Sequence, residues 1–216
     1  MNQAAPSTNS STISAPAARL AIAAAASTIL LLASLHVLSP EFDPSWRVVS
    51  EYANGRFGWV LSLMFVSWAV ASWSLVVALW SQLTGIGGRI ALGFLIASGV
   101  GEAMASVCDI NHPLHNLAGM IGVLSLPIAA TSIGVRLIRL QAWAAAKPVL
   151  LLTASLTWVS LVLLVVALIA LMTRHRITPP GIEIIGWTNR FLVVAYCAWV
   201  VTVAWQALKL RRTASP

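Results

Sequence analysis

The sequence predicts an all-α integral membrane protein in which six transmembrane helices form one bundle. Of its 216 residues, 59% are apolar and only 9% are charged, a composition that few soluble domains share. Crossing about 30 Å of hydrocarbon takes roughly 20 mostly apolar residues in a helix, and the chain offers six segments of about that length. These segments are continuous and rich in Leu and Ala, whereas the strands of a membrane barrel alternate over about ten residues, so a barrel is excluded.

The apolar segments divide the chain into three regions. Residues 1–17, which are rich in Ser, Thr, Ala and Asn, are expected to form a disordered cytoplasmic tail. Residues 18–210 form the six-helix transmembrane domain, and residues 211–216 form a second cytoplasmic tail. The six spans are expected near Ala18–Leu38, Phe57–Trp80, Arg89–Cys108, His115–Leu137, Pro148–Met172 and Gly186–Leu208.

Charged residues are distributed unequally between the two faces that six spans would create. The face with both termini has eight cations and no acid: Arg19, Arg89, Arg136, Arg139, Lys147, Lys209, Arg211 and Arg212. The opposite face has five arginines and all six acids: Arg47, Arg56, Arg174, Arg176 and Arg190 with Glu41, Asp43, Glu51, Glu102, Asp109 and Glu183. Because Lys and Arg in short loops mark the cytoplasmic side, both termini are predicted to be cytoplasmic. The protein itself is predicted to lie in the cell (inner) membrane.

The net charge of +7 is therefore interpreted as a topology signal and as an attraction to anionic lipid. No basic stripe with interleaved aromatic residues is present, so nucleic acid is excluded as a partner. The partners that remain are the lipid bilayer and, as an open alternative, another membrane protein.

The first outer loop, residues 39–56, is long for a connection between helices. Pro40 should end the first span, and a short helix along the interface is expected to end at Asn54 and Gly55, with Gly55 as a left-handed cap. Long ordered loops are often functional, but a solvated connector anchored by Trp46 and Tyr52 fits the same residues.

The third span contains a carboxyl group, Glu102, about 10 Å below its outer end. A carboxylate at that depth is costly unless it is paired or faces water. Arg190 lies at comparable depth in the sixth span, so we predict a Glu102–Arg190 ion pair that orients helices. The alternative is a carboxylate in a cavity that handles a proton or a polar headgroup. On the same span, Gly93, Ala97 and Gly101 form a stripe of small residues that permits close helix packing.

Polar residues with metal-binding or acid–base chemistry cluster around the turn between the third and fourth spans. Pro113 should force a tight turn that places His115 in the first turn of the fourth helix, beside Asp109. Imidazole and carboxylate groups suit zinc, and an open position would activate water. The spacing matches no established metal motif, and a bis-histidine haem site is disfavoured, so no cofactor is predicted.

Three overlapping sets of candidate residues follow. The weak metal-ligand candidates are His36, Asp109 and His115, to which Glu51 and His175 could add ligands. The catalytic candidates are Glu51, Asp109 and His115. The structural or binding polar cluster comprises Ser50, Glu51, Glu102, Asp109, His112, His115 and Arg190.

The order of these features resembles a known family. Six spans, Pro-x-x-Asp-Pro followed by Ser50-Glu51, Asp109 followed by His115, and Gly186 followed by Arg190 are similar to the bacterial membrane proteins grouped as domain of unknown function 998. The resemblance covers residues 20–210. It implies a six-helix membrane protein with its polar motifs on the non-cytoplasmic side and no assigned activity. The family-like residues are Ser50, Glu51, Asp109, His115 and Arg190.

Three classes of function are compatible with the sequence, which leaves open whether the protein is an enzyme. An accessory, structural or binding role is favoured. The alternative is an intramembrane hydrolase of lipid or headgroup, which could depend on a metal. A proton-coupled transporter using Glu102 is least favoured, because transporters usually show internal repeats or helices broken near the midplane.

Overall fold

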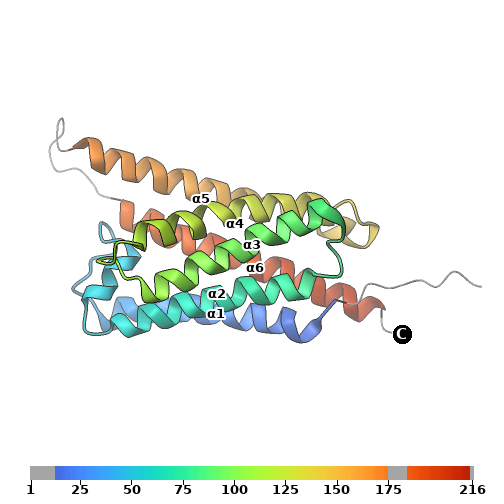
Figure 1. Ribbon diagram of the computed structural model, residues 1–216, viewed down its shortest axis with the longest axis horizontal. Helices are drawn as coiled ribbons and strands as arrows, with labels where there is room; N and C mark the ends of the chain where they lie inside the picture. The colour runs from blue at the N-terminus through green and yellow to red at the C-terminus, as the bar shows by residue number, and fades with distance from the viewer. Residues whose placement is uncertain (1–12, 175–183, 215–216) are drawn as a thin grey trace, which may run out of the picture.

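The structure, a computed structural model, describes residues 13–174 and 184–214, and within them all regular secondary structure is helical. Figure 1 shows the long helices side by side, running along the long axis of the molecule. In the described residues, six helices are long and apolar enough to cross a membrane, which confirms the six spans. They are α1 (Ala15–Leu38), α2 (Gly58–Leu79), α3 (Gly85–Val107), α4 (His115–Leu137), α5 (Lys147–Arg174) and α6 (Ile185–Ala214).

The bounds of the helices agree closely with the predicted spans. The start of α4 at His115 is as predicted, and α1 begins three residues earlier than expected, at Ala15. Residues 1–12 of the predicted tail lie outside the described residues. At the C-terminal end of the chain, α6 extends past its predicted limit, Leu208, to Ala214.

Two short 3₁₀ helices, η1 (Val49–Asn54) and η2 (Gln141–Ala146), lie in the connections. The helix expected in the first outer loop is therefore present as η1. Its predicted left-handed cap is wrong, because Gly55 has φ −91° and ψ 169°. A Cβ at Gly55 would lie 2.8 Å from the Phe42 ring, so the glycine is required for close packing rather than for its conformation.

The bundle has two chemically different ends. The start of α1, the end of α6 and the connections α2–α3 and α4–α5 lie at one end, together with the eight cations that share a face in the sequence; we call it the basic end. The connections formed by residues 39–57 and 108–114 lie at the opposite end, which we call the loop end. Consecutive helices pack against one another, and α6 also packs against α1 and α2.

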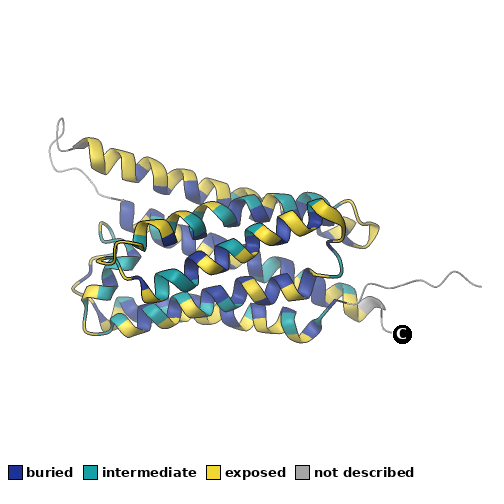
Figure 2. Cartoon of the chain, in the orientation of Figure 1, coloured by how far each residue is buried: buried dark blue, intermediate teal, exposed yellow. Residues whose placement is uncertain are grey.

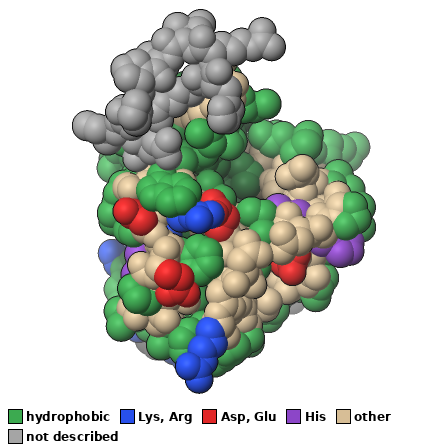
Figure 3. Space-filling model, turned by 90° about the vertical axis from the view of Figure 1, so that its left-hand side faces the viewer, with side chains coloured by type: hydrophobic (Ala, Val, Ile, Leu, Met, Phe, Trp, Pro, Cys, Tyr) green, Lys and Arg blue, Asp and Glu red, His purple; other side chains and the backbone are tan. Residues whose placement is uncertain are grey.

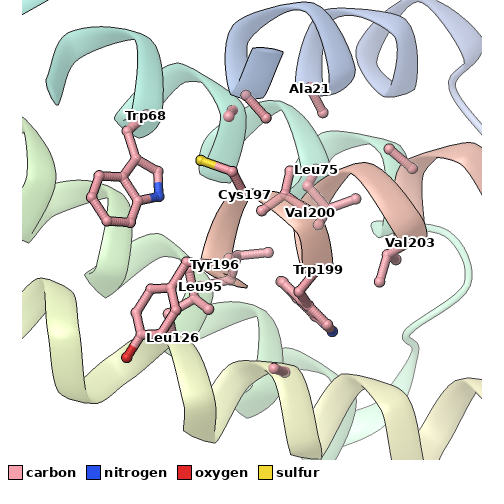
Figure 4. Packing of buried hydrophobic residues seen from close by; sticks show 14 of the residues in the cluster. Ala21, Trp68, Leu75, Leu95, Leu126, Tyr196, Cys197, Trp199, Val200 and Val203 are labelled. Carbon is pink, nitrogen blue, oxygen red and sulfur yellow. The ribbon is translucent and has the colours of Figure 1, made fainter. Parts of the chain in front are cut away.

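Helix α6 is the most buried of the six, and α5 is the least. Figure 2 shows α5 exposed along most of its length. The core gathers around α6, where Tyr196, Trp199 and Val203 are fully or almost fully buried and pack among Leu75, Leu95 and side chains of the other helices (Figure 4). The apolar side chains that remain exposed on α5 suit contact with lipid.

Candidate functional site

The loop end displays the polar residues that the sequence singled out. Figure 3, which looks onto this end, shows acidic, basic and histidine side chains among hydrophobic ones, and a hollow between hydrophobic side chains. The polar residues belong to three separate arrangements. One surrounds Arg190, the second surrounds Glu102, and the third borders a groove between α4 and α5.

Arg190 is buried, with 4% of its surface exposed, and in the part of the chain that the structure describes its guanidinium group donates to neutral acceptors. Nε donates to His36 Nε2 at 2.7 Å, and Nη2 donates to the Tyr52 hydroxyl at 3.0 Å. Nη1 donates to the carbonyl oxygens of Arg47 at 2.7 Å and Gly186 at 3.0 Å. Arg190 therefore ties α6 to α1, to the first loop and to η1.

The first loop approaches α6 closely enough to reach Arg190 because of a glycine. A Cβ on Gly186 would collide with the Pro44 carbonyl oxygen, and the Gly186 N–H donates to the Ser45 carbonyl at 3.0 Å. Beside this contact, the hydroxyl and the backbone N–H of Ser45 both donate to Asp43. These two bonds lower the pKa of the Asp43 carboxyl group below its ordinary value.

The surroundings of His36 make it a poor metal ligand. Its Nδ1 lies 2.8 Å from the Leu32 carbonyl, which can only accept, so Nδ1 carries the proton. Its Nε2 then accepts from Arg190. Since both ring nitrogens are engaged, His36 has no lone pair to offer a metal.

Glu102 lies at the contact of α2, α3 and α4, with 5% of its surface exposed. The hydroxyls of Ser72 and Ser98 each lie 3.0 Å from one of its carboxyl oxygens. Ser98 Oγ is also 3.2 Å from the Gly122 carbonyl oxygen on α4. The predicted Glu102–Arg190 ion pair is wrong, because α3 packs mainly on α2 and α4, whereas α6 packs mainly on α1, α2 and α5.

The predicted stripe of small residues on α3 is only partly used. Gly101 lies so close to Gly122 on α4 that a Cβ at Gly101 would collide with the Gly122 backbone. Gly93 is exposed, with nothing within 4 Å of where its Cβ would be. The Gly101–Gly122 contact brings α4 within reach of Ser98, and so helps to define the environment of Glu102.

The catalytic candidates each have a partner of their own. Glu51 forms an ion pair with Arg47 and accepts from the Val48 N–H at 3.1 Å, which stabilises the first turn of η1. Asp109 accepts from the Asn111 N–H at 2.9 Å, and His115 Nδ1 lies 2.9 Å from the Cys108 carbonyl. His115 forms no ion pair with either acid among the described residues.

The predicted metal site does not assemble in the part of the chain that the structure describes. No group of three or more His, Cys, Asp or Glu side chains there lies close enough together to hold a metal ion. His112 is exposed and accepts from the Leu114 N–H at 3.1 Å. His175 lies outside the described residues. The candidates His36, Asp109 and His115 thus all lie at the loop end but do not converge on one point.

A groove of about 340 Å³ runs between α4 and α5 from the loop end. Its polar border, at the loop end, consists of Ser50, His115, Asn116 and Asn189. Val48 of the first loop lies next to this border. The deeper walls are apolar and consist of Gly119, Met120, Val123, Leu124, Leu161, Leu164, Val165 and Leu168. The lining therefore changes from polar to apolar with depth.

Several residues with important contacts gave no signal in the sequence. Tyr52 was expected to anchor the loop at the interface, yet it is fully buried against Arg190. Asn189 accepts from the Val49 N–H at 2.8 Å, and Asn54 accepts from the Asn111 side chain at 2.8 Å. These contacts join the first loop to α6 and to the α3–α4 turn. Asparagine is common in loops and at helix ends, so only the positions of Asn54 and Asn189 in the bundle distinguish them from other asparagines.

Comparison with known proteins identifies a family. No curated protein and no solved structure matches the chain. The family described as protein of unknown function DUF998 matches residues 22–206, which is most of the sequence. This match confirms the family that the sequence resembles. The chain is thus a multi-pass membrane protein that belongs to the DUF998 family.

Proposed function

We propose that this protein binds a membrane lipid in the groove between α4 and α5, as an accessory or binding protein rather than as a hydrolase. The observation that supports this function is the change from polar to apolar lining along the groove. A lipid has the same order of chemistry, with a polar headgroup and ester region followed by acyl chains. Ligand pockets of roughly 300–1,000 Å³ hold small molecules, and the groove lies within that range.

The length of the groove fits one leaflet of a bilayer. From His115 to Leu124 the lining of α4 rises roughly 13 Å, at 1.5 Å per residue. Half of a hydrocarbon core of about 30 Å is about 15 Å. An acyl chain lying along Val123, Leu161 and Leu164 would then extend from the loop end to the middle of the membrane.

The polar border suits the uncharged part of a lipid. Because the Cys108 carbonyl only accepts, His115 donates through Nδ1, and its Nε2 remains an acceptor. The Asn189 oxygen accepts from Val49, which leaves its amide hydrogens as donors. With the Ser50 hydroxyl and the Asn116 amide, the border offers donors and acceptors but no charged side chain. Hydroxyl and ester oxygens match this chemistry.

The orientation in the membrane is part of the proposal. The basic end faces the cytoplasm and the loop end faces outward, because eight cations and no acid lie at the basic end. The groove then opens to the outer leaflet of the cell membrane. An impermeant maleimide should label Ser45→Cys in intact cells and Gln141→Cys only after lysis, in a background that lacks the native cysteines. The reverse order of labelling would contradict the orientation.

A hydrolase or a transporter is less well supported. The catalytic candidates Glu51, Asp109 and His115 each have a separate local partner. A proton carrier would use Glu102, whose two carboxyl oxygens already lie against serine hydroxyls within the bundle. Binding requires only the groove and its border, both of which are formed by described residues.

The groove can be blocked without disturbing the helices. Gly119 on α4 lines it, and nothing lies within 4 Å of where a Cβ would be, so Gly119→Leu should place its side chain in the groove. Gly93→Leu is the matched control, since Gly93 is equally open but lies on α3 outside the groove. Both changes replace a helical glycine with a good helix former.

The measurement is photo-crosslinking in phosphatidylcholine vesicles that contain a phosphatidylcholine with a photoreactive acyl chain. We expect crosslinks at Leu161, Leu164 and Val123 that fall roughly tenfold in Gly119→Leu and remain in Gly93→Leu, as expected if about 1.4 kcal/mol of binding is lost. Equal crosslinking of the two variants, or crosslinks spread evenly over all exposed helix faces, would rule out a lipid site in the groove.

A further inference from the structure

At the basic end, opposite the groove, the first turn of α1 and the last turns of α6 enclose a hollow of about 510 Å³. Three arginines line it, Arg19 from α1 and Arg211 and Arg212 from α6, and all three are exposed. Its remaining lining is apolar and consists of Ala15, Pro16 and Leu208. None of the residues that line the groove contributes to this hollow.

The charge of the hollow is not balanced by acidic side chains. The chain has no Asp or Glu before Glu41 or after Glu183, and the other two connections at this end, residues 80–84 and 138–146, have none either. Within the described part of the chain, Arg19 and Arg212 form no ion pair. The positive charges of Arg19 and Arg212 would therefore be stabilised by an anion in the hollow.

Other cations at the basic end are engaged differently. The Arg89 guanidinium lies 3.7 Å from the centre of the Trp80 ring, and the Lys209 ammonium lies 5.9 Å from that of Trp205. Aromatic rings paired with cations are typical of the membrane interface. The hollow lies at the ends of two spans, α1 and α6, where lipid phosphates would be found.

We infer that this hollow binds the phosphate of an anionic lipid in the leaflet at the basic end. Guanidinium groups match phosphate oxygens through paired hydrogen bonds. Basic pockets between spans are suited to anionic headgroups. The N–H groups of Ala15 and Ala17 in the first turn of α1 add donors, since Ser14 makes no side-chain cap there. Ala15, Pro16 and Leu208 provide apolar contacts for the part of the lipid next to its phosphate, which free phosphate would not use.

The experiment measures lipid binding to the full chain in detergent by native mass spectrometry. Phosphatidylglycerol is titrated against phosphatidylcholine, and inorganic phosphate is added as a competitor. We expect phosphatidylglycerol to bind more tightly than phosphatidylcholine. The double variant Arg19→Gln/Arg212→Gln should bind phosphatidylglycerol about thirtyfold more weakly, because each arginine near a lipid headgroup contributes about 1 kcal/mol.

The matched control is Arg139→Gln/Lys147→Gln, which removes the same charge from exposed positions at the same end but outside the hollow. It should retain the affinity of the unmodified protein, as should Gly119→Leu, which blocks only the groove. Equal losses in the two double variants would show a general charge effect and overturn the site. Competition by inorganic phosphate at the same concentration as the lipid would show a simple anion site and overturn the lipid assignment.

Discussion

Arg190 and Glu102 both have ionisable side chains buried among apolar helices, but their surroundings differ. Arg190 donates to four acceptors contributed by α1, the first loop, η1 and α6 itself. Glu102 lies against two serine hydroxyls, one of which also reaches α4. Among the described residues, neither side chain forms an ion pair. In the described residues, the bundle therefore accommodates these two buried ionisable groups with neutral hydrogen-bond partners.

The two arrangements also differ in what they hold together. Arg190 joins segments that are far apart in the sequence, and it binds the long first loop through the Arg47 carbonyl and the Tyr52 hydroxyl. Glu102 joins helices that already pack closely through Gly101 and Gly122. We therefore expect the loop end to depend on Arg190 more than the α2–α3–α4 contact depends on Glu102.

Replacing Arg190 should have the largest effect. Arg190→Gln removes most of the four hydrogen bonds and leaves the Tyr52 hydroxyl and His36 Nε2 buried with fewer partners. We expect a loss of about 3 kcal/mol or more in the free energy of unfolding, measured as a lower melting temperature in detergent. The control is Arg56→Gln, an exposed arginine at the same end. Equal melting temperatures of the two variants would show that the four bonds add no stability.

The contribution of one of these bonds can be measured through Tyr52. Tyr52→Phe removes the acceptor of Arg190 Nη2 but keeps the ring that packs on His36 and Phe42. A bond to a charged group contributes about 1.5–3 kcal/mol, so we expect a loss of about 2 kcal/mol. Tyr196→Phe is the matched variant near Glu102, where the hydroxyl donates to the neutral Val123 carbonyl at 2.7 Å, and it should lose only about 1 kcal/mol. A larger loss in Tyr196→Phe than in Tyr52→Phe would contradict the stronger dependence on Arg190.

Removing the carboxyl group should have a smaller effect. In Glu102→Leu, Ser98 can still donate to the Gly122 carbonyl, so only the Ser72 hydroxyl loses its acceptor. We expect a loss of about 1–2 kcal/mol in thermal unfolding. Adding Ser72→Ala should restore part of it, because the unsatisfied hydroxyl is then removed as well. A more stable Glu102→Leu protein would indicate that the carboxyl group is retained for a function and not for the fold.

The smallest expected effect is the coupling between the two sites. Because Glu102 and Arg190 do not touch, the losses in Glu102→Gln and Arg190→Gln should add within about 0.5 kcal/mol in the double variant. A double-mutant cycle on melting in detergent measures this directly. A double variant that loses much less than the sum would restore the ion pair predicted from the sequence.

Much of the fold could be predicted because its signals are local. Length and hydropathy predict each span without knowledge of its neighbours. Pro113 prevents a continuous helix regardless of how the helices pack, which is why the start of α4 at His115 could be predicted. A short helix in the first loop was predicted as well, whereas the conformation of Gly55 was not, since it depends on the Phe42 ring that packs against it.

The partners within the candidate site could not be predicted. Depth along a helix can be counted from the sequence, and it placed Glu102 and Arg190 at similar levels. Which helices are neighbours, and which face each helix turns inward, cannot be counted in this way. The contacts of Ser72 and Ser98 with Glu102 could not be predicted for the same reason. Serine is an ordinary residue in membrane spans, and its sequence position does not show whether it lies opposite a carboxyl group.

The sequence by itself determined that six apolar helices cross a membrane and that cations and acids are divided between the two ends, because hydrophobicity and charge act residue by residue. The tertiary structure alone decided the partners of Arg190 and Glu102, the groove between α4 and α5 and the hollow formed by Arg19, Arg211 and Arg212. Each of these features requires side chains from helices that are distant in the sequence, and their meeting depends on the order and rotation of whole helices in the bundle.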